Sequence, residues 1–184
     1  MLKTAKYAFV ESLKKMLEKT TLDQITVTDI VEDCGVSRQA FYYYFNDIYD
    51  LLEWIYIDEA DRALADNRDI DTWQRGYCQI LLRLKENKSL VMNTYRSIRR
   101  EYLETFMYDL LFDLIYPVVV TQAEGMNVAK EHEEFIARFY SLAIIAIGLD
   151  WVRSDMKEDP EAIVEQVSVL VKGDFKKALG KYAQ

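Results

Sequence analysis

A short interruption of a helical pattern at residues 34–37 constrains the fold most strongly. Gly35 can adopt the positive φ that ends a helix, and Ser37 can cap the helix that follows. Upstream, Thr26 can cap an earlier helix, and Asp29 lies three residues later as the acidic partner of a capping box. The stretch is therefore predicted to form a helix, a tight turn and a second helix.

The second helix of this stretch has two chemically different faces. At about 100° per residue, Phe41, Phe45 and Ile48 fall within a narrow arc, which is the predicted buried side. The opposite side is rich in Arg, Gln and Tyr, which suits the major groove of DNA, because Arg and Gln bond base edges and tyrosine hydroxyls reach phosphate. A helical hairpin with an aromatic core is the alternative. The predicted DNA contacts are Thr26, Thr28, Ser37, Arg38, Gln39, Tyr42, Tyr43 and Tyr44.

The stretch also resembles the TetR family of bacterial regulators. Its members typically read Thr-x-x-x-Ile-Ala-x-x-Ala-Gly-Val-Ser-x-x-Thr-Phe-Tyr-x-His-Phe-x-x-Lys-x-x-Leu. Ala40, Tyr44 and Ile48 depart from this pattern at positions that often contact phosphate in the family. The resemblance implies a helix-turn-helix DNA-binding domain. The positions that match in register are Thr26, Ile30, Gly35, Val36, Ser37, Phe41, Tyr42, Phe45 and Leu51.

Two further segments are similar to one branch of that family. Residues 45–55 and 147–161 resemble the dihydroxyacetone-kinase-regulator branch, which has Phe-Lys-Asp-Lys-Tyr-Asp-Leu-x-x-Trp-Ile in the first segment. This chain has Asn46 and Ile48 in place of the two lysines. The anchoring of this region to phosphate is therefore expected to be weaker than in the branch.

The charge of the chain is unusual for a DNA-binding protein. The net charge is −8, and residues 1–50 hold six Lys or Arg against eight Asp or Glu, which gives −2. Few phosphate contacts and a shallow salt dependence of binding are therefore expected. The basic groups available to phosphate are Arg38 and the Lys3/Lys6 end of the chain.

Composition and apolar periodicity predict an all-α protein of about nine helices. Apolar residues make up 51% of the 184 residues, with only six glycines and two prolines to interrupt helices. Residues 1–47 are expected to form a three-helix helix-turn-helix domain, and 48–184 a helical ligand-sensing and dimerisation domain. A polar break is predicted at 67–71. The expected helices cover about 3–19, 26–45 (two helices), 48–65, 72–86, 89–98, 100–123, 130–156 and 160–179.

The helix expected at about 130–156 is apolar on more than one side. Ile144, Ile145 and Ile147 cannot all face one core, so the helix is either buried centrally or paired with another subunit. A single reader of this size needs a two-fold partner to reach two half-sites. The resemblance implies a four-helix bundle in which the helices at about 130–156 and 160–179 pair with those of a second copy. We therefore expect a homodimer.

The motifs of catalysis and cofactor binding are missing from the sequence, so no enzyme activity, cofactor or metal is predicted. His132 lies among three glutamates at a helix start and is expected to be solvated. The resemblance implies a small-molecule effector in the C-terminal domain. Six residues could line its cavity or equally fill a core: Tyr77, Met92, Tyr95, Phe106, Met107 and Tyr108.

These observations predict a sequence-specific, TetR-type transcriptional regulator that binds a palindromic operator on double-stranded DNA as a homodimer, modulated by a small-molecule effector. No apolar run is expected to be long enough to span a membrane, and the N-terminus has no signal-peptide core, so we expect a cytoplasmic protein. The alternative is a protein-interaction module or co-regulator of the same fold that binds DNA weakly and acts through a partner protein. The acidic N-terminal region favours this alternative.

Overall fold

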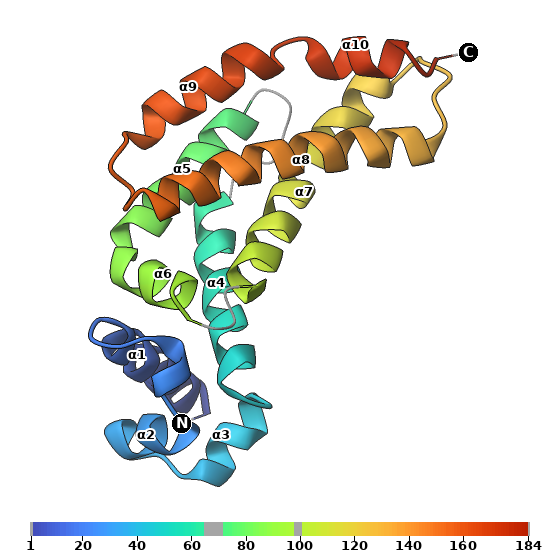
Figure 1. The fold of residues 1–184 in the computed structure, drawn as a ribbon. Helices are drawn as coiled ribbons and strands as arrows, with labels where there is room; N and C mark the ends of the chain where they lie inside the picture. Colours follow the sequence, from blue (N-terminus) through green and yellow to red (C-terminus); the bar gives the residue numbers. More distant parts are fainter. Residues whose placement is uncertain (1, 65–71, 98–100, 184) are drawn as a thin grey trace. The chain divides into compact units, whose positions relative to one another are not determined.

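The computed structural model describes residues 2–64, 72–97 and 101–183, and within these residues it contains helices and no strand (Figure 1). The predicted all-α class is confirmed. The break expected at 67–71 lies outside the described residues. The elements are α1 (Leu2–Leu17), the 3-10 helix η1 (Leu22–Gln24), α2 (Val27–Cys34), α3 (Arg38–Tyr44), α4 (Ile48–Leu64), α5 (Trp73–Glu86), α6 (Lys88–Tyr95), α7 (Glu101–Ala123), α8 (Lys130–Arg153), α9 (Pro160–Val171) and α10 (Asp174–Gly180).

Two helix ends differ from the prediction because of left-handed backbone. The helix expected at 160–179 is two helices, since Gly173 has φ +77° between α9 and α10. The helix expected to reach residue 156 ends at Arg153, and Asp155 and Met156 both have positive φ. Left-handed backbone is compatible with a single turn residue but not with a continuing right-handed helix.

Two further helix features depend on single residues. Asn87 holds the N-cap position of α6, and Ser89, where this helix was expected to begin, lies within it. α7 continues past Pro117 to Ala123. Pro117 and Asp113, whose carbonyl loses its helical donor, are both exposed, so water can satisfy that carbonyl.

The chain divides into two compact units. The first unit comprises Met1–Glu59 and Asn87–Phe106, and the second comprises Ala60–Glu86 and Met107–Gln184. α4 and α7 each contribute residues to both units.

An aromatic cluster forms the core of the first unit. Phe41 of α3 is fully buried, and its ring centroid lies 5.2 Å from that of Phe9 and 5.7 Å from that of Phe45. Ile48 is also buried, so the predicted inner arc is confirmed. At the edge of this core, Asn93 of α6 donates a hydrogen bond to the Leu17 carbonyl at 2.7 Å, which caps the end of α1.

The core of the second unit includes residues that the sequence left open between a cavity and a core. Tyr77 and Met107 are each 1% exposed, and the Tyr77 hydroxyl donates to the Ile144 carbonyl at 3.3 Å. A Cβ atom added at Gly148 would lie 3.2 Å from Met107 Cε, so α8 packs closely on these side chains. Tyr77 and Met107 are therefore core residues.

One expectation about α8 was wrong. Among the described residues it is the one helix long and apolar enough, by length and composition, to cross a membrane. Within its most apolar window, 44% of the helix is buried inside the protein. Because the core helix of a soluble protein meets the same criterion, this finding carries no membrane assignment.

Candidate nucleic-acid interface

The predicted capping box and turn are present between α1 and α3. The Thr26 N–H donates to Asp29 Oδ2 at 2.8 Å, and the Asp29 N–H donates to Thr26 Oγ1 at 3.2 Å. Gly35 ends α2 with φ +64°, and Ser37 Oγ accepts from the Ala40 N–H at 3.2 Å. The turn is thus fixed by hydrogen bonds within the segment itself.

Thr26→Ala is expected to destabilise the protein by about 1 kcal/mol, because the Asp29 N–H loses its acceptor and the Asp29 carboxylate loses the Thr26 hydroxyl donor. Urea unfolding of this variant measures the loss. Thr21→Ala is the matched control, since the Thr21 side chain makes no capping hydrogen bond to η1. Equal stability of the two variants would contradict a stabilising role for the box.

The same box makes a prediction about pH. Hydrogen bonds from the Thr26 side chain and backbone lower the pKa of Asp29. A folded-state pKa below the unfolded one gives stability that is present above the unfolded pKa and lost as pH falls through the folded pKa. The stability difference between Thr26→Ala and the wild type should therefore shrink at strongly acid pH, and a difference that grows on acidification would contradict the assignment.

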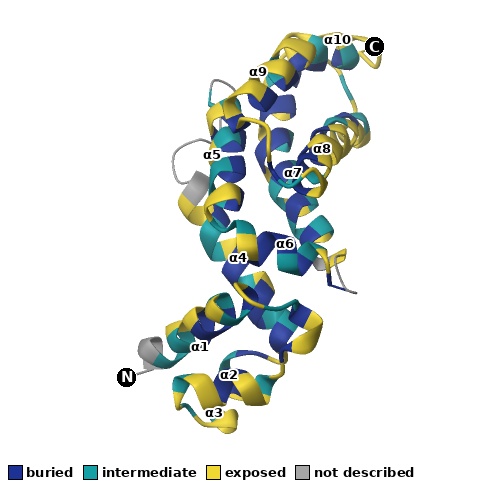
Figure 2. Ribbon diagram, turned by 60° about the vertical axis from the view of Figure 1, so that its left-hand side comes forward, coloured by how far each residue is buried: buried dark blue, intermediate teal, exposed yellow. Residues whose placement is uncertain are grey.

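Much of α2 and α3 is exposed (Figure 2). Three of the predicted DNA contacts meet on these two helices. Arg38 donates from Nη2 to Tyr42 Oη at 3.2 Å and from Nη1 to Thr28 Oγ1 at 3.4 Å. All three side chains are exposed, and the guanidinium carbon lies 5.7 Å from the centre of the Tyr42 ring. These contacts hold a flexible cation in one orientation at the start of α3.

The remaining predicted contacts lie around this cluster. Gln39 is exposed, and Tyr43 is the most open aromatic of α3, at 73% exposure. Tyr44 is half-buried, and its ring packs edge-on against Tyr43, with centroids 5.0 Å apart. Thr26 and Ser37 are exposed but are already used as helix caps. Arg, Gln and Tyr side chains on one open face are the groups that contact bases and phosphates.

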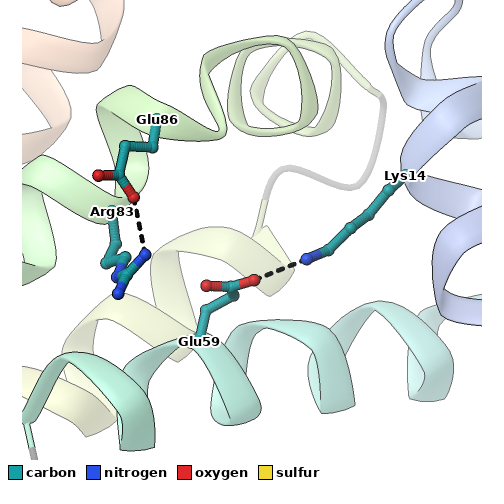
Figure 3. A network of polar contacts seen from close by, with 4 residues as sticks. All are labelled: Lys14, Glu59, Arg83 and Glu86. Atoms are coloured by element: carbon teal, nitrogen blue, oxygen red, sulfur yellow. Dashed lines mark hydrogen bonds and ion pairs between the residues drawn. The ribbon is translucent and has the colours of Figure 1, made fainter. Parts of the chain in front are cut away.

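Lys6 has a contact that the sequence did not reveal. Its ammonium lies 4.0 Å from the Trp54 ring centre and 5.4 Å from the Phe45 ring centre. Two other lysines of α1 are neutralised instead, Lys14 by Glu59 at 2.6 Å and Lys15 by an acidic side chain of α2 at 2.5 Å. Figure 3 shows the Lys14–Glu59 pair between α1 and α4.

The second unit carries an exposed apolar surface, called here the α8/α9 stripe. The large apolar side chains on the stripe are 40–71% exposed, whereas Ile144 and Ile145, on another side of α8, are buried. The expectation that α8 is apolar on two sides is therefore confirmed. A groove of about 310 Å³ on this surface is lined mainly by residues of α8 and α9. The large apolar residues of the stripe are Phe135, Phe139, Leu142, Ile147, Val169 and Leu170.

His132 differs from its prediction. It is half-buried, and its ring stacks on Tyr182 with centroids 4.2 Å apart and planes inclined by 16°, so it is not simply solvated. Across the described residues, no group of three or more His, Cys, Asp or Glu is arranged to hold a metal ion.

Comparison with known families identifies the class of protein. Residues 71–173 match the family described as "Transcriptional regulator C-terminal region", and residues 12–55 match "Bacterial regulatory proteins, tetR family". The chain therefore belongs to the TetR family, and it is a transcriptional regulator of the TetR type. The helix-turn-helix predicted from residues 26–45 lies within the N-terminal match.

Individual relatives agree with this assignment. Over 139 residues the chain is 27% identical to the HTH-type dhaKLM operon transcriptional activator DhaS of Lactococcus lactis subsp. lactis (strain IL1403), covering 74% of this chain and 73% of DhaS. It is 24% identical over 172 residues to the uncharacterized HTH-type transcriptional regulator YxbF of Bacillus subtilis (strain 168), covering 88% of this chain and 43% of YxbF. The first of these relatives agrees with the branch that the sequence resembles.

Solved structures share the fold. The dihydroxyacetone kinase operon activator DhaS superposes with a TM-score of 0.69 at 22% identity, covering 97% of this chain and 98% of that one. A TetR transcriptional regulator from Streptococcus agalactiae 2603V gives a TM-score of 0.67 at 20% identity, covering 92% and 94%.

Proposed function

We propose that two copies of the chain bind a palindromic operator, with α3 of each copy in the major groove. The observation that carries the proposal is the oriented Arg38 on an exposed face of α2 and α3. Arg38 and Gln39 read base edges, and the hydroxyl-bearing side chains contact the sugar-phosphate backbone of the DNA. Residues 1–47 hold this reader, and 48–184 hold the sensing and dimerisation functions. The side chains proposed to contact the DNA backbone are Thr26, Thr28, Ser37, Tyr42, Tyr43 and Tyr44.

The α8/α9 stripe supports the dimer. Clustered, exposed Phe, Leu, Val and Ile side chains are rare on monomers and typical of subunit interfaces. In the proposed dimer, α8 and α9 pair with the same helices of the second copy. A two-fold axis through the stripe places one reader on each half of a palindrome.

The regulatory part of the proposal is a small-molecule effector bound by the second unit. Such a ligand shifts the equilibrium between a DNA-binding conformation and a non-binding conformation only by the difference in its affinity for the two. α4 and α7, which have residues in both units, are the segments through which such a shift reaches the reader. The protein acts on DNA in the cytoplasm, by binding rather than by catalysis.

Selection of bound duplexes from a random DNA pool, at low and moderate salt, tests the proposal. The expected result is an enriched palindrome whose half-site centres lie about 10 base pairs, or a multiple of one helical turn, apart. Absence of enrichment at every salt concentration would contradict DNA reading and would instead fit the co-regulator alternative.

A further inference from the structure

The ammonium groups of the described α1 lysines, Lys6, Lys14 and Lys15, contact different kinds of side chain. The ammonium groups of Lys14 and Lys15 lie against carboxylates. The Lys6 ammonium lies instead against the faces of Trp54 and Phe45, and within the described residues these rings are its contacts. An aromatic face attracts a cation without neutralising it, so Lys6 keeps its full positive charge for a partner.

The position of Lys6 relative to α3 is informative. Arg38 begins α3, and Phe45 is the residue that ends it. Because Lys6 packs over Phe45, the two cations lie at opposite ends of the helix. α3 has seven residues, which rise about 10 Å, and the major groove is about 12 Å wide. Cations at the two ends of such a helix lie near the two phosphate walls of the groove.

The acidic groups near this end of α3 are already engaged in backbone capping. Asp47 Oδ1 accepts from the N–H groups of Tyr49 and Asp50 at 2.8 and 2.9 Å, and Asp50 Oδ2 accepts from the Asn46 N–H at 2.9 Å. These carboxylates are therefore held at the start of α4. The junction of α3 and α4 has Asn46 and Ile48 rather than cations, so a positive charge there must come from another element.

We propose that Lys6 contacts a DNA phosphate at the end of α3 opposite Arg38, and that Trp54 is the residue that positions it. The inference rests on the proposed DNA binding. Trp54 and Phe45 restrict a side chain that is otherwise flexible, so less conformational entropy is lost when the phosphate is bound. For Lys6, a DNA phosphate takes the place that a carboxylate occupies beside Lys14 and beside Lys15.

The test is the salt dependence of DNA affinity for wild type, Lys6→Gln, Lys6→Arg and Lys19→Gln. The probes are the duplex enriched from the random pool and a random-sequence duplex of the same length. Lys6→Gln should lower the slope of log affinity against log salt by about 0.9 for each copy, nearly 2 for the dimer, because one counterion-releasing contact is lost. Lys6→Arg should retain the slope. Lys19→Gln removes the same charge beyond the other end of α1 and should also retain it.

Trp54 has a separate readout. Trp54→Phe keeps an aromatic face and should bind like the wild type, whereas Trp54→Leu should weaken binding while the thermal unfolding of the two variants stays matched. An unchanged slope in Lys6→Gln, or an equal loss in Lys19→Gln, overturns the inference while leaving DNA binding intact. Failure of the wild type to bind either duplex overturns the proposed function and this inference together.

Discussion

Leu142→Asp is expected to convert the dimer to a monomer and to abolish tight operator binding. Leu142 lies in the α8/α9 stripe and is 49% exposed in the single chain. In the proposed two-fold bundle each dimer would bury two carboxylates in an apolar seam, and each desolvated charge costs several kcal/mol. The monomer should stay folded, because Leu142 is not part of its core. Light scattering after size exclusion at micromolar concentration measures the mass.

Ile57→Asp is the matched control for this experiment. Ile57 is an exposed apolar residue of α4 in the first unit, with 45% exposure, and it lies outside the stripe. Its substitution should leave the mass unchanged. A dimeric Leu142→Asp protein, or a wild type that is already monomeric at micromolar concentration, would contradict the proposed seam.

Arg38→Ala combined with Tyr42→Ala is expected to remove specific DNA binding. A bidentate base contact contributes about 1–3 kcal/mol of discrimination, and loss of the Tyr42 hydroxyl and ring also removes the support that orients Arg38. Affinity for the enriched duplex should therefore fall by at least about 100-fold, at little cost in stability, since both side chains are exposed. Fluorescence anisotropy with a labelled duplex measures the change.

The single variants should separate the two roles. Arg38→Ala alone should relax preference at one base position, whereas Tyr42→Phe should weaken binding to all sequences similarly. Arg83→Ala is the control, because Arg83 belongs to the second unit, its side chain is 43% exposed and it pairs with Glu86 at 2.8 Å (Figure 3). Retention of the enriched sequence preference by the double variant would exclude α3 as the reader.

The helix-turn-helix could be predicted because its signals are local. Thr26, Gly35 and Ser37 act on N–H groups or backbone angles within a few residues, so their effect is visible in sequence spacing. The burial of Phe41 and Phe45 followed from helical periodicity alone. The same holds for the two apolar sides of α8.

The differences arose where longer-range geometry or unusual backbone decides the structure. Gly173 lies within an apolar pattern that continues on both sides of it, so the pattern predicts one helix there, and Asp155 has a positive φ that its residue type does not require. The contact of Lys6 with Trp54 joins residues 48 positions apart, and His132 meets Tyr182 across 50 positions. Only tertiary packing brings these pairs together, so sequence spacing holds no signal for them.

The mass of the complex between the protein and its enriched palindrome tests the central claim most directly, namely that a two-fold pair of readers binds the DNA. Native mass spectrometry should show two chains on each palindromic duplex and no populated complex with one chain. Duplexes with a single half-site should bind far more weakly. A complex of one chain with one half-site that binds as tightly as the full palindrome would contradict the account.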